Sequence, residues 1–316
     1  MCTAVTYKTE CHYFGRNLDL ERSYNERVVI TPRNYKFYFR CEAPVEHHYA
    51  MIGMATVVDG YPLYYEATNE KGLSMAGLNF PGNADYKPYT EGKTNITPFE
   101  FIPWILGLYA NVSEAREALY SFNHVSINFS DELPLSPLHW IISDRDESMV
   151  VECVGEGVKI YDAPLGVLTN NPTYDYHMTN IANYMSLHEG AAENRLSKNV
   201  SLSNHSLGTG AIGLPGDYTS ASRFVRAAFV RSKSPKTGDE KQSVAQFFHI
   251  LGSVAMPLGC VMTPDGQYEY TRYSCCCNTD KCIYYYRTYE NSALTQVSMD
   301  CCDIDGKALY VSETIS

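Results

Sequence analysis

Cys2, directly after Met1, is the residue with the clearest chemical potential in the sequence. If Met1 is removed, this one residue carries a thiol and a free α-amino group, which are a nucleophile and a base on the same Cα atom. A thiol must lose its proton before it attacks, and a nearby base usually accepts that proton. A terminal amine has an ordinary pKa of about 7.7–8.0, so much of it can accept a proton near neutral pH. Cys2 therefore has what attack on a carbonyl carbon requires.

The residues that follow predict a β-hairpin that would bring charged groups to Cys2. Residues 3–7 are β-branched and aromatic with apolar residues interspersed, which indicates a strand. A second strand is expected at 12–14, after a short polar turn, and would deliver Gly15–Asp19 to the neighbourhood of Cys2. An arginine and a carboxylate would then lie beside the thiol. An ordinary hairpin end would show the same cluster, and most cysteines at a second position have no role.

The start of the chain resembles the choloylglycine hydrolase family, which holds bile salt hydrolases and penicillin V acylases. The resemblance rests on Cys2 and on the run Phe-Gly-Arg-Asn-Leu-Asp at 14–19. Members of this family are N-terminal-nucleophile amidohydrolases. The family's order of residues continues over nearly the whole chain, and the full set is Cys2, Arg16, Asp19, Asn79, Asn170 and Arg223.

The three later residues have ordinary explanations when each is taken alone. Asn79 lies in Leu-Asn-Phe-Pro-Gly and Asn170 in Leu-Thr-Asn-Asn-Pro, and asparagine before proline or glycine is common in turns. Arg223 begins a predicted helix, where an arginine is usually solvated. Their order and spacing are what resemble the family. Asn79 also favours the bile salt hydrolase branch, because penicillin V acylases typically carry a tyrosine there.

The residue types suit the steps of amide hydrolysis. The Cys2 thiolate would attack the carbonyl, and the negative charge that develops on oxygen needs fixed donors, which the side chains of Asn79 and Asn170 can supply. Asp19 can hold the terminal amine, and the positive charge of Arg16 favours the thiolate. A further cation, Arg223, can pair with Asp19 or stabilise charge in the site. The resemblance implies no metal and no organic cofactor.

The resemblance also implies a conjugated bile salt as substrate, with release of glycine or taurine. Its steroid body needs an apolar wall, and Leu18 is the first candidate because it lies within the catalytic run. Further candidates, each of which plain core packing would explain equally well, are Tyr24, Phe80, Leu133 and Leu138. The nearest alternative substrate is penicillin V or another N-acyl amide, since the catalytic residues would be the same and only the pocket would differ.

Composition limits the partners. The chain has 316 residues, of which 45% are hydrophobic and 19% charged, so it is expected to fold. The net charge of −11 argues against nucleic acid, which requires basic patches. The sequence has no apolar run long enough for a transmembrane helix and no secretory signal at its start, so we expect no membrane insertion and a cytoplasmic protein. For an anionic substrate, local arginines must counter the overall field.

Eleven cysteines leave a second class of function open. Cys275–Cys277 with Cys282, and the pair Cys301–Cys302, resemble a metal cluster, and a non-catalytic thiol-rich protein would bind zinc there. However, adjacent strand residues point to opposite faces, and the gap from Cys277 to Cys282 is wider than in structural zinc sites. We expect buried strand residues instead. The nine histidines show no ligand spacing and are expected on the surface or as hydrogen-bonded core residues.

The periodicity along the chain predicts many strands and two blocks of helices, which indicates a layered α+β class instead of alternating βαβ units. The resemblance implies the four-layer αββα sandwich of N-terminal-nucleophile hydrolases, with two antiparallel sheets, in a single domain over 1–316 from which Met1 is removed. Residues 188–219 are rich in Gly, Ser and Asn and form a long irregular connection. The family implies a homo-oligomer, commonly a tetramer, and this segment is a plausible interface. Strands are expected at 27–31, 35–39, 49–58, 63–67, 73–80, 124–128, 138–143, 148–153, 157–161, 167–169, 267–273, 281–289, 293–300 and 308–311, and helices at 99–109, 114–121, 174–187, 220–230 and 240–254.

Overall fold

The computed structural model describes residues 1–313 and contains two large antiparallel sheets. The first has six strands in the order β12–β1–β2–β13–β14–β15, and the second has eight in the order β11–β10–β9–β6–β5–β4–β3–β16. The bounds in the first sheet are β1 Cys2–Lys8, β2 His12–Leu20, β12 Val167–Leu168, β13 Tyr270–Asn278, β14 Ile283–Thr288 and β15 Thr295–Ser298. Those in the second are β3 Arg27–Thr31, β4 Met51–Val58, β5 Tyr61–Asn69, β6 Ser74–Asn79, β9 Leu138–Ser143, β10 Ser148–Val154, β11 Gly157–Asp162 and β16 Tyr310–Val311.

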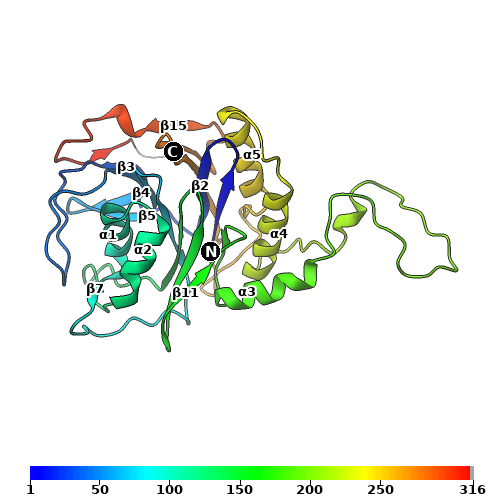
Figure 1. Cartoon of the computed structure of the whole chain (residues 1–316), viewed down its shortest axis with the longest axis horizontal. Helices are drawn as coiled ribbons and strands as arrows, with labels where there is room; N and C mark the ends of the chain where they lie inside the picture. The colour runs from blue at the N-terminus through cyan, green and yellow to red at the C-terminus, as the bar shows by residue number, and fades with distance from the viewer. Residues whose placement is uncertain (314–316) are drawn as a thin grey trace.

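Helices cover the outer side of each sheet (Figure 1). The helices α1 (Phe101–Leu108) and α2 (Val112–Ala118) lie on the side of the eight-stranded sheet, next to a short parallel pair of β7 (Thr94–Ile96) and β8 (Phe122–His124). On the other side, α4 (Ser220–Lys233) and α5 (Glu240–Gly252) pack on the six-stranded sheet, and α3 (Tyr174–Ile181) packs on α4. The predicted αββα sandwich with two antiparallel sheets is confirmed. None of the helices within residues 1–313 has the length and apolarity that crossing a bilayer requires.

Two hydrophobic cores hold these layers together. One lies between the eight-stranded sheet and its helices, and it is filled by aromatic residues such as Phe101, Trp104 and Trp140. The other runs from the space between the sheets through the six-stranded sheet to Phe224 of α4 and Phe247 of α5. Cys2 belongs to this second core, so the first residue of β1 lies inside the sandwich and not on its surface.

Several local predictions were wrong by a few residues. The helix expected from residue 114 begins two residues earlier, at Val112, because the Asn111 side chain accepts the Glu114 N–H and caps the helix. Residues 35–39 form only an isolated bridge between Phe37 and Val45 in place of a strand. The strand expected at 124–128 ends at His124, and that expected at 267–273 is instead β13, which runs to Asn278.

The cysteine prediction was correct for one cluster only. Cys275–Cys277 are buried in β13 as expected, while Cys282 follows the strand and Cys301 and Cys302 lie in or after a short 3₁₀ turn at the surface. All eleven cysteines are free thiols.

Residues 185–219 leave the sandwich as a long arm between α3 and α4 (Figure 1). The predicted irregular structure is confirmed, with a single 3₁₀ turn at Thr209–Ala211 among the described residues. The arm exposes several large apolar side chains to solvent, namely Met185, Leu196, Val200, Leu202, Leu207 and Ile212.

Candidate active site

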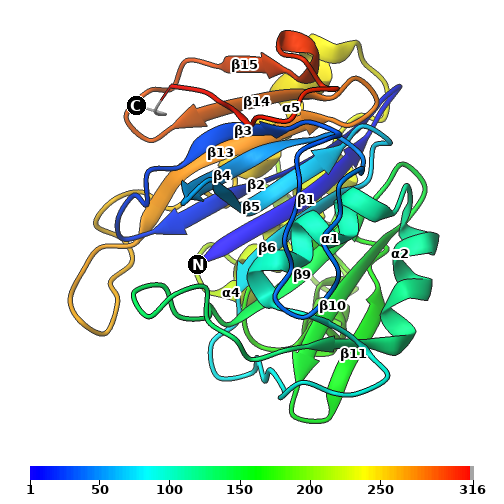
Figure 2. The ribbon, with the colours of Figure 1, turned by 90° about the vertical axis from the view of Figure 1, so that its left-hand side faces the viewer.

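The predicted hairpin brings Arg16 and Asp19 to Cys2. Cys2 opens β1 and is the cross-strand partner of Leu18, while Arg16 pairs with Ala4 two residues along. Figure 2 shows β1 and β2 side by side, with the N-terminus at the end of β1. The second strand is longer than expected, so that Arg16 and Asp19 belong to β2 itself instead of following it.

Gly15 permits β2 to lie where it does. A Cβ atom at this position would stand 2.0 Å from the Cys275 carbonyl oxygen in β13, far inside van der Waals contact. No other residue type can occupy a strand position where a neighbouring backbone approaches this closely. The glycine that precedes Arg16 is therefore required by the packing of the strand that carries both charged residues.

The alternation of β2 sends its polar residues to opposite faces of the sheet. Arg16 faces the eight-stranded sheet, where its Nη1 donates to the Gly77 carbonyl oxygen at 2.6 Å. Asn17 faces the helices, where its Nδ2 donates to the Leu251 carbonyl oxygen of α5 at 2.9 Å. Because cross-strand partners share a face, the Cys2 thiol lies on the Arg16 side, between the sheets.

A compact hydrogen-bond network holds the backbone of Cys2. The Asn170 Oδ1 atom accepts the Cys2 N–H at 2.8 Å and Nη2 of Arg223 at 2.8 Å. Nη1 of Arg223 donates to the Cys2 carbonyl oxygen at 2.5 Å. Nδ2 of Asn170 donates to the Asn79 carbonyl oxygen at 2.7 Å, which joins the ends of β6 and β12. Four residues that are far apart in sequence are thus linked by direct bonds.

The two asparagines are placed differently. Both partners of Asn170 Oδ1 are donors, so the orientation of its amide is fixed and its oxygen points to the Cys2 nitrogen. The side-chain amide of Asn79 is half-buried and makes no hydrogen bond to any residue within 1–313. The geometry therefore suits Asn170 to hold the nucleophile and leaves the Asn79 amide available for an oxygen of a substrate.

Asp19 presents one free oxygen beside the N-terminus. Its Oδ1 accepts the Thr271 hydroxyl at 2.6 Å, whereas its Oδ2 is buried and has no partner among residues 1–313. The Met1 amine donates to the Asp19 backbone oxygen at 2.9 Å and contacts the carboxylate of Glu269. Burial lowers the pKa of this amine, although the charges of Cys2 and Asp19 oppose the shift.

Two fully buried arginines flank Cys2 from opposite faces. Burial disfavours the charge of Arg16, but Cys2, Tyr273 and Glu66 outweigh this effect and raise its pKa above the ordinary value. Burial lowers the pKa of Arg223, with opposition from Asp19 and Cys2. Within the described part of the chain no ion pair joins Arg223 to Asp19, and Arg223 instead donates to oxygens of its neighbours.

Sequence reasoning missed the residues that hold the Asn170 segment. His177 of α3 donates through Nε2 to the Asn170 carbonyl oxygen at 2.8 Å, and His139 of β9 donates to that of Thr169 at 2.9 Å. The other nitrogen of His139 lies 3.0 Å from Glu152 Oε1. Both histidines are fully buried, as expected of core histidines. The signal that could have pointed to this arrangement is the carboxylate of Glu152 within a buried strand.

The expected pocket residues differ in their exposure. Phe80 is 0% exposed and stacks on the His139 ring with 4.1 Å between centroids, so it offers no surface in this conformation. Leu18 is 3% exposed, next to Cys2, while Leu133 and Leu138 are half-buried. Tyr24, in the loop after β2, is 37% exposed. Their roles in substrate binding stay predictions.

The choloylglycine hydrolase family model, described as linear amide C–N hydrolases, matches residues 2–312. The chain is 55% identical over 300 residues to a bile salt hydrolase/transferase of Lactiplantibacillus plantarum, which covers 95% of this chain and 93% of the relative. It is 40% identical to a bile salt hydrolase/transferase of Clostridium perfringens, over 98% of this chain and 95% of the relative.

Solved structures agree with these matches. A mutant conjugated bile acid hydrolase of Clostridium perfringens superposes with a TM-score of 0.92 at 38% identity, covering 100% of this chain and 98% of that one. A penicillin V acylase of Agrobacterium tumefaciens gives 0.76 at 20% identity, over 98% of this chain and 90% of that one, which supports the fold alone. The chain belongs to the choloylglycine hydrolase family, and it has the N-terminal-nucleophile fold with a cysteine at the nucleophile's position.

Proposed function

We propose that this protein hydrolyses the amide bond of glycine- or taurine-conjugated bile salts and releases the free bile acid and the amino acid. The observation that carries the proposal is the bonding of Cys2, whose nitrogen and carbonyl oxygen are held by Asn170 and Arg223 in a chain 55% identical to a bile salt hydrolase/transferase. Cys2 is the first residue of β1, so after removal of Met1 its own terminal amine would be the base nearest to the thiol.

Removal of Met1 is the first step that the mechanism requires. It converts the Cys2 N–H into an amine, which keeps the Asn170 Oδ1 acceptor at 2.8 Å and gains further hydrogens to donate. The Oδ2 atom of Asp19, which is buried and has no partner among residues 1–313, can accept one of these hydrogens and carries the opposite charge. We also propose that the mature chain works as a single domain, which the match of one family model to residues 2–312 supports.

The chemistry then proceeds through a thioester. The amine takes the Cys2 proton, and the thiolate attacks the amide carbon to give a tetrahedral oxyanion, for which the free Asn79 amide is a donor. The protonated amine donates to the leaving nitrogen as the C–N bond breaks, and glycine or taurine departs. Water, deprotonated by the same amine, attacks the thioester, so the bile acid leaves and the thiol is restored. Arg16, on the thiol side of the sheet, favours the thiolate throughout.

An amine that reaches the thioester in place of water would form a new amide and complete a transfer reaction. The relatives named bile salt hydrolase/transferase are the reason to test for it. Both reactions share the acyl-enzyme, so products must be identified and not only the loss of substrate.

The substrate is an anion and the protein has a net charge of −11, so recognition depends on local cations. Arg16 and Arg223 supply positive charge next to the nucleophile. We expect the steroid body to lie against Leu18 and the more exposed Tyr24, with the half-buried Leu133 and Leu138 further along, and Phe80 behind them as support.

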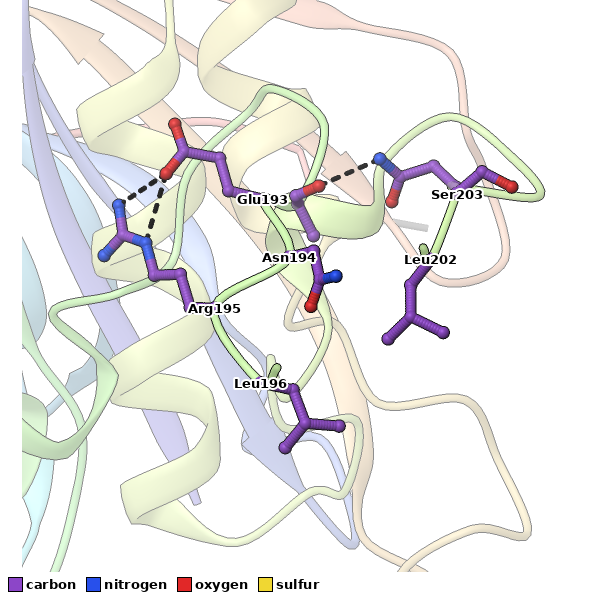
Figure 3. A pocket seen from close by; sticks show the side chains of 8 residues that line it. Glu193, Asn194, Arg195, Leu196, Leu202 and Ser203 are labelled. Atoms are coloured by element: carbon purple, nitrogen blue, oxygen red, sulfur yellow. Dashed lines mark hydrogen bonds and ion pairs between the residues drawn. The ribbon is translucent and has the colours of Figure 1, made fainter. Parts of the chain in front are cut away.

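We further propose that the protein forms a homo-oligomer, specifically a tetramer, through the arm at residues 185–219. Its exposed apolar side chains support this, because monomers rarely expose several large apolar residues on one projecting segment. A hollow within the arm is lined by polar and apolar arm residues, including Leu196 and Leu202 (Figure 3). A cytoplasmic location, where the eleven free thiols stay reduced, is part of the same proposal.

The test is amine release from glycocholate, taurocholate and penicillin V side by side, under reducing conditions, with a Cys2→Ala control and intact-mass analysis. We expect release from the bile salts by a protein that lacks Met1, and none from the control, whose melting temperature should stay near that of the parent. Release from penicillin V alone would overturn the substrate. Turnover by Cys2→Ala, or by protein that retains Met1, would overturn the mechanism.

A further inference from the structure

Glu66 of β5 is a carboxylate buried between the two sheets, with 2% of its surface exposed. The Tyr273 hydroxyl donates to its Oε2 at 2.8 Å, and the Tyr284 hydroxyl donates to its Oε1 at 2.6 Å. The Cys275 thiol donates to Oε1 at 3.5 Å. Nε of Arg16 lies 3.8 Å from Oε2, which makes an ion pair. A carboxylate is rarely buried unless it is both paired and hydrogen-bonded, and Glu66 is both.

A β-bulge in β5 aims Glu66 at this position. Glu66 pairs with Met54 and Tyr64 with Ala55, so Tyr65 has no partner in the ladder. Without the bulge, Tyr64 and Glu66 would share a face. With it, Tyr64 faces the helix-side core while Glu66 faces the six-stranded sheet. Bulges often re-aim a side chain next to an active site.

The same bulge supplies a bond to Arg16. The Tyr65 carbonyl oxygen, outside the ladder, accepts Nη1 of Arg16 at 3.2 Å, and the Gly77 carbonyl oxygen accepts it at 2.6 Å. These backbone bonds hold the guanidinium in place without help from Glu66. Nη2 is buried and has no partner within the described range 1–313, so one end of the guanidinium stays free.

A second bulge, in β13, completes the arrangement. Asp19 pairs with Thr271 and Leu18 with Tyr273, so Arg272 is the extra residue. Thr271 thereby reaches the Asp19 carboxylate on the helix side, and Tyr273 reaches Glu66 between the sheets. Two bulges on facing sheets thus bring a carboxylate, its donors and an arginine together beside the nucleophile.

The charges around Cys2 then offset one another. Asp19 acts on both the N-terminal amine and Arg223 without a direct ion pair to Arg223, and Glu66 opposes Arg16 between the sheets. An arginine without a counter-charge would over-stabilise the thiolate, and the intrinsic nucleophilicity of a thiolate falls as its pKa falls. The balance therefore matters for rate as well as for burial.

We propose that Glu66 is a positioning residue that offsets the charge of Arg16 and so keeps the Cys2 thiol nucleophilic near neutral pH. The inference rests on the proposed role of Cys2. The titratable or charged groups that face Glu66 from the packed strands are Arg16 of β2, Tyr273, Cys275 and Cys277 of β13 and Tyr284 of β14, and Cys2 of β1 acts on Arg16. Only Arg16 among these carries a positive side-chain charge.

The test is the pH dependence of Cys2 alkylation by iodoacetamide, followed by mass spectrometry of the N-terminal peptide. This readout needs no bile salt, so a wrong substrate assignment would not disturb it. Glu66→Gln removes the charge and keeps the shape, and we expect the alkylation midpoint to fall by about one pH unit. The pH at the midpoint of the acid limb of the kcat/KM profile should fall by the same amount. Tyr284→Phe removes a hydrogen bond but no charge and should leave the midpoint where it is. An unmoved midpoint in Glu66→Gln, or an equal shift in Tyr284→Phe, would overturn the proposal.

A double variant covers the case in which Glu66→Gln does not fold. Arg16→Gln and Glu66→Gln each leave one buried charge unpaired, whereas the double variant leaves none. We expect the double variant to melt at a higher temperature than either single variant, or to be soluble where they are not. A double variant that is no more stable than the better of the two single variants would show that charge balance is not what Glu66 contributes.

Discussion

The active site and the arm at residues 185–219 are built in opposite ways. At the site, Arg16 and Arg223 are 0% exposed, and fixed hydrogen bonds hold the backbone of Cys2, the Asn170 amide and both guanidinium groups. In the arm, Leu196 is 88% and Leu207 100% exposed. Most backbone hydrogen bonds there join residues that are three apart in the sequence. Preorganised donors serve chemistry because they need no rearrangement at the moment of reaction. Exposed apolar surface favours association, so the comparison supports the proposal that one region catalyses the reaction and the other forms the interface between subunits.

The largest effect that would test this separation is the loss of the Asp19 charge. Asp19→Asn keeps an acceptor for Thr271 but removes the counter-charge of the terminal ammonium. We expect kcat/KM to fall by about a hundredfold or more, within the range of general acid–base contributions. Thr271→Val is the control, because it removes the hydroxyl that bonds Asp19 and Met256 and keeps the Asp19 charge, and its loss of kcat/KM should be far smaller. Equal losses in the two variants would mean that the charge of Asp19 is not what the reaction requires.

The second effect concerns the support of Asn170. His139→Leu removes the donor to the Thr169 carbonyl oxygen and leaves the buried Glu152 with the Tyr174 N–H as its remaining donor. We expect the free energy of unfolding to fall by about 3 kcal/mol, as for other broken buried pairs. We also expect kcat to fall by about tenfold, because the Asn170 segment shifts. His139→Gln retains a donor and should recover part of kcat, and a kcat unchanged in both variants would remove His139 from the site's support.

These supporting residues also show why the sequence predicted only part of the site. The Cys2 hairpin follows from local alternation, and the order of the six site residues resembles a family pattern, so both were accessible. Glu66 and His139 sit in strands where alternation predicts only that a residue is buried. Their partners come from strands distant in the sequence, and bulges at Tyr65 and Arg272 shift the register that a period of two assumes.

The cysteines teach the same point on a smaller scale. Burial of Cys275–Cys277 was predicted because a strand pattern surrounds them, and they lie in β13. Cys301 and Cys302 were assigned to a strand as well, but β15 ends at Ser298 and a 3₁₀ turn follows. The end of a strand depends on where its neighbour β14 ceases to pair, which no local pattern records.

A third effect is the response of stability to pH. Burial lowers the pKa of His12 and of His177 to about 4 and that of His124 to about 3. Each histidine binds a proton more readily when the chain is unfolded, so stability is complete above about pH 6.5 and is lost as the pH falls toward the folded pKa values. The upper limit is about 3 kcal/mol for a shift from 6.5 to 4. Urea unfolding at pH 7, 6, 5 and 4 measures this slope, and His177→Gln should reduce it. A slope that is the same in that variant would contradict the linkage.

The smallest effect on activity should come from the arm. Leu196→Ser with Leu207→Ser removes apolar surface that is almost wholly exposed, so the folded chain loses no core packing. We expect kcat/KM for bile salts to change by less than about twofold, as for surface substitutions away from a site. Light scattering after size exclusion should show a smaller assembly, while Ser203→Ala in the same arm should leave the assembly unchanged. If the doubly substituted protein keeps its size, the arm is not the interface. If it loses activity in proportion to its assembly, the two regions are coupled, because the partner subunit's arm would then be needed to complete the site.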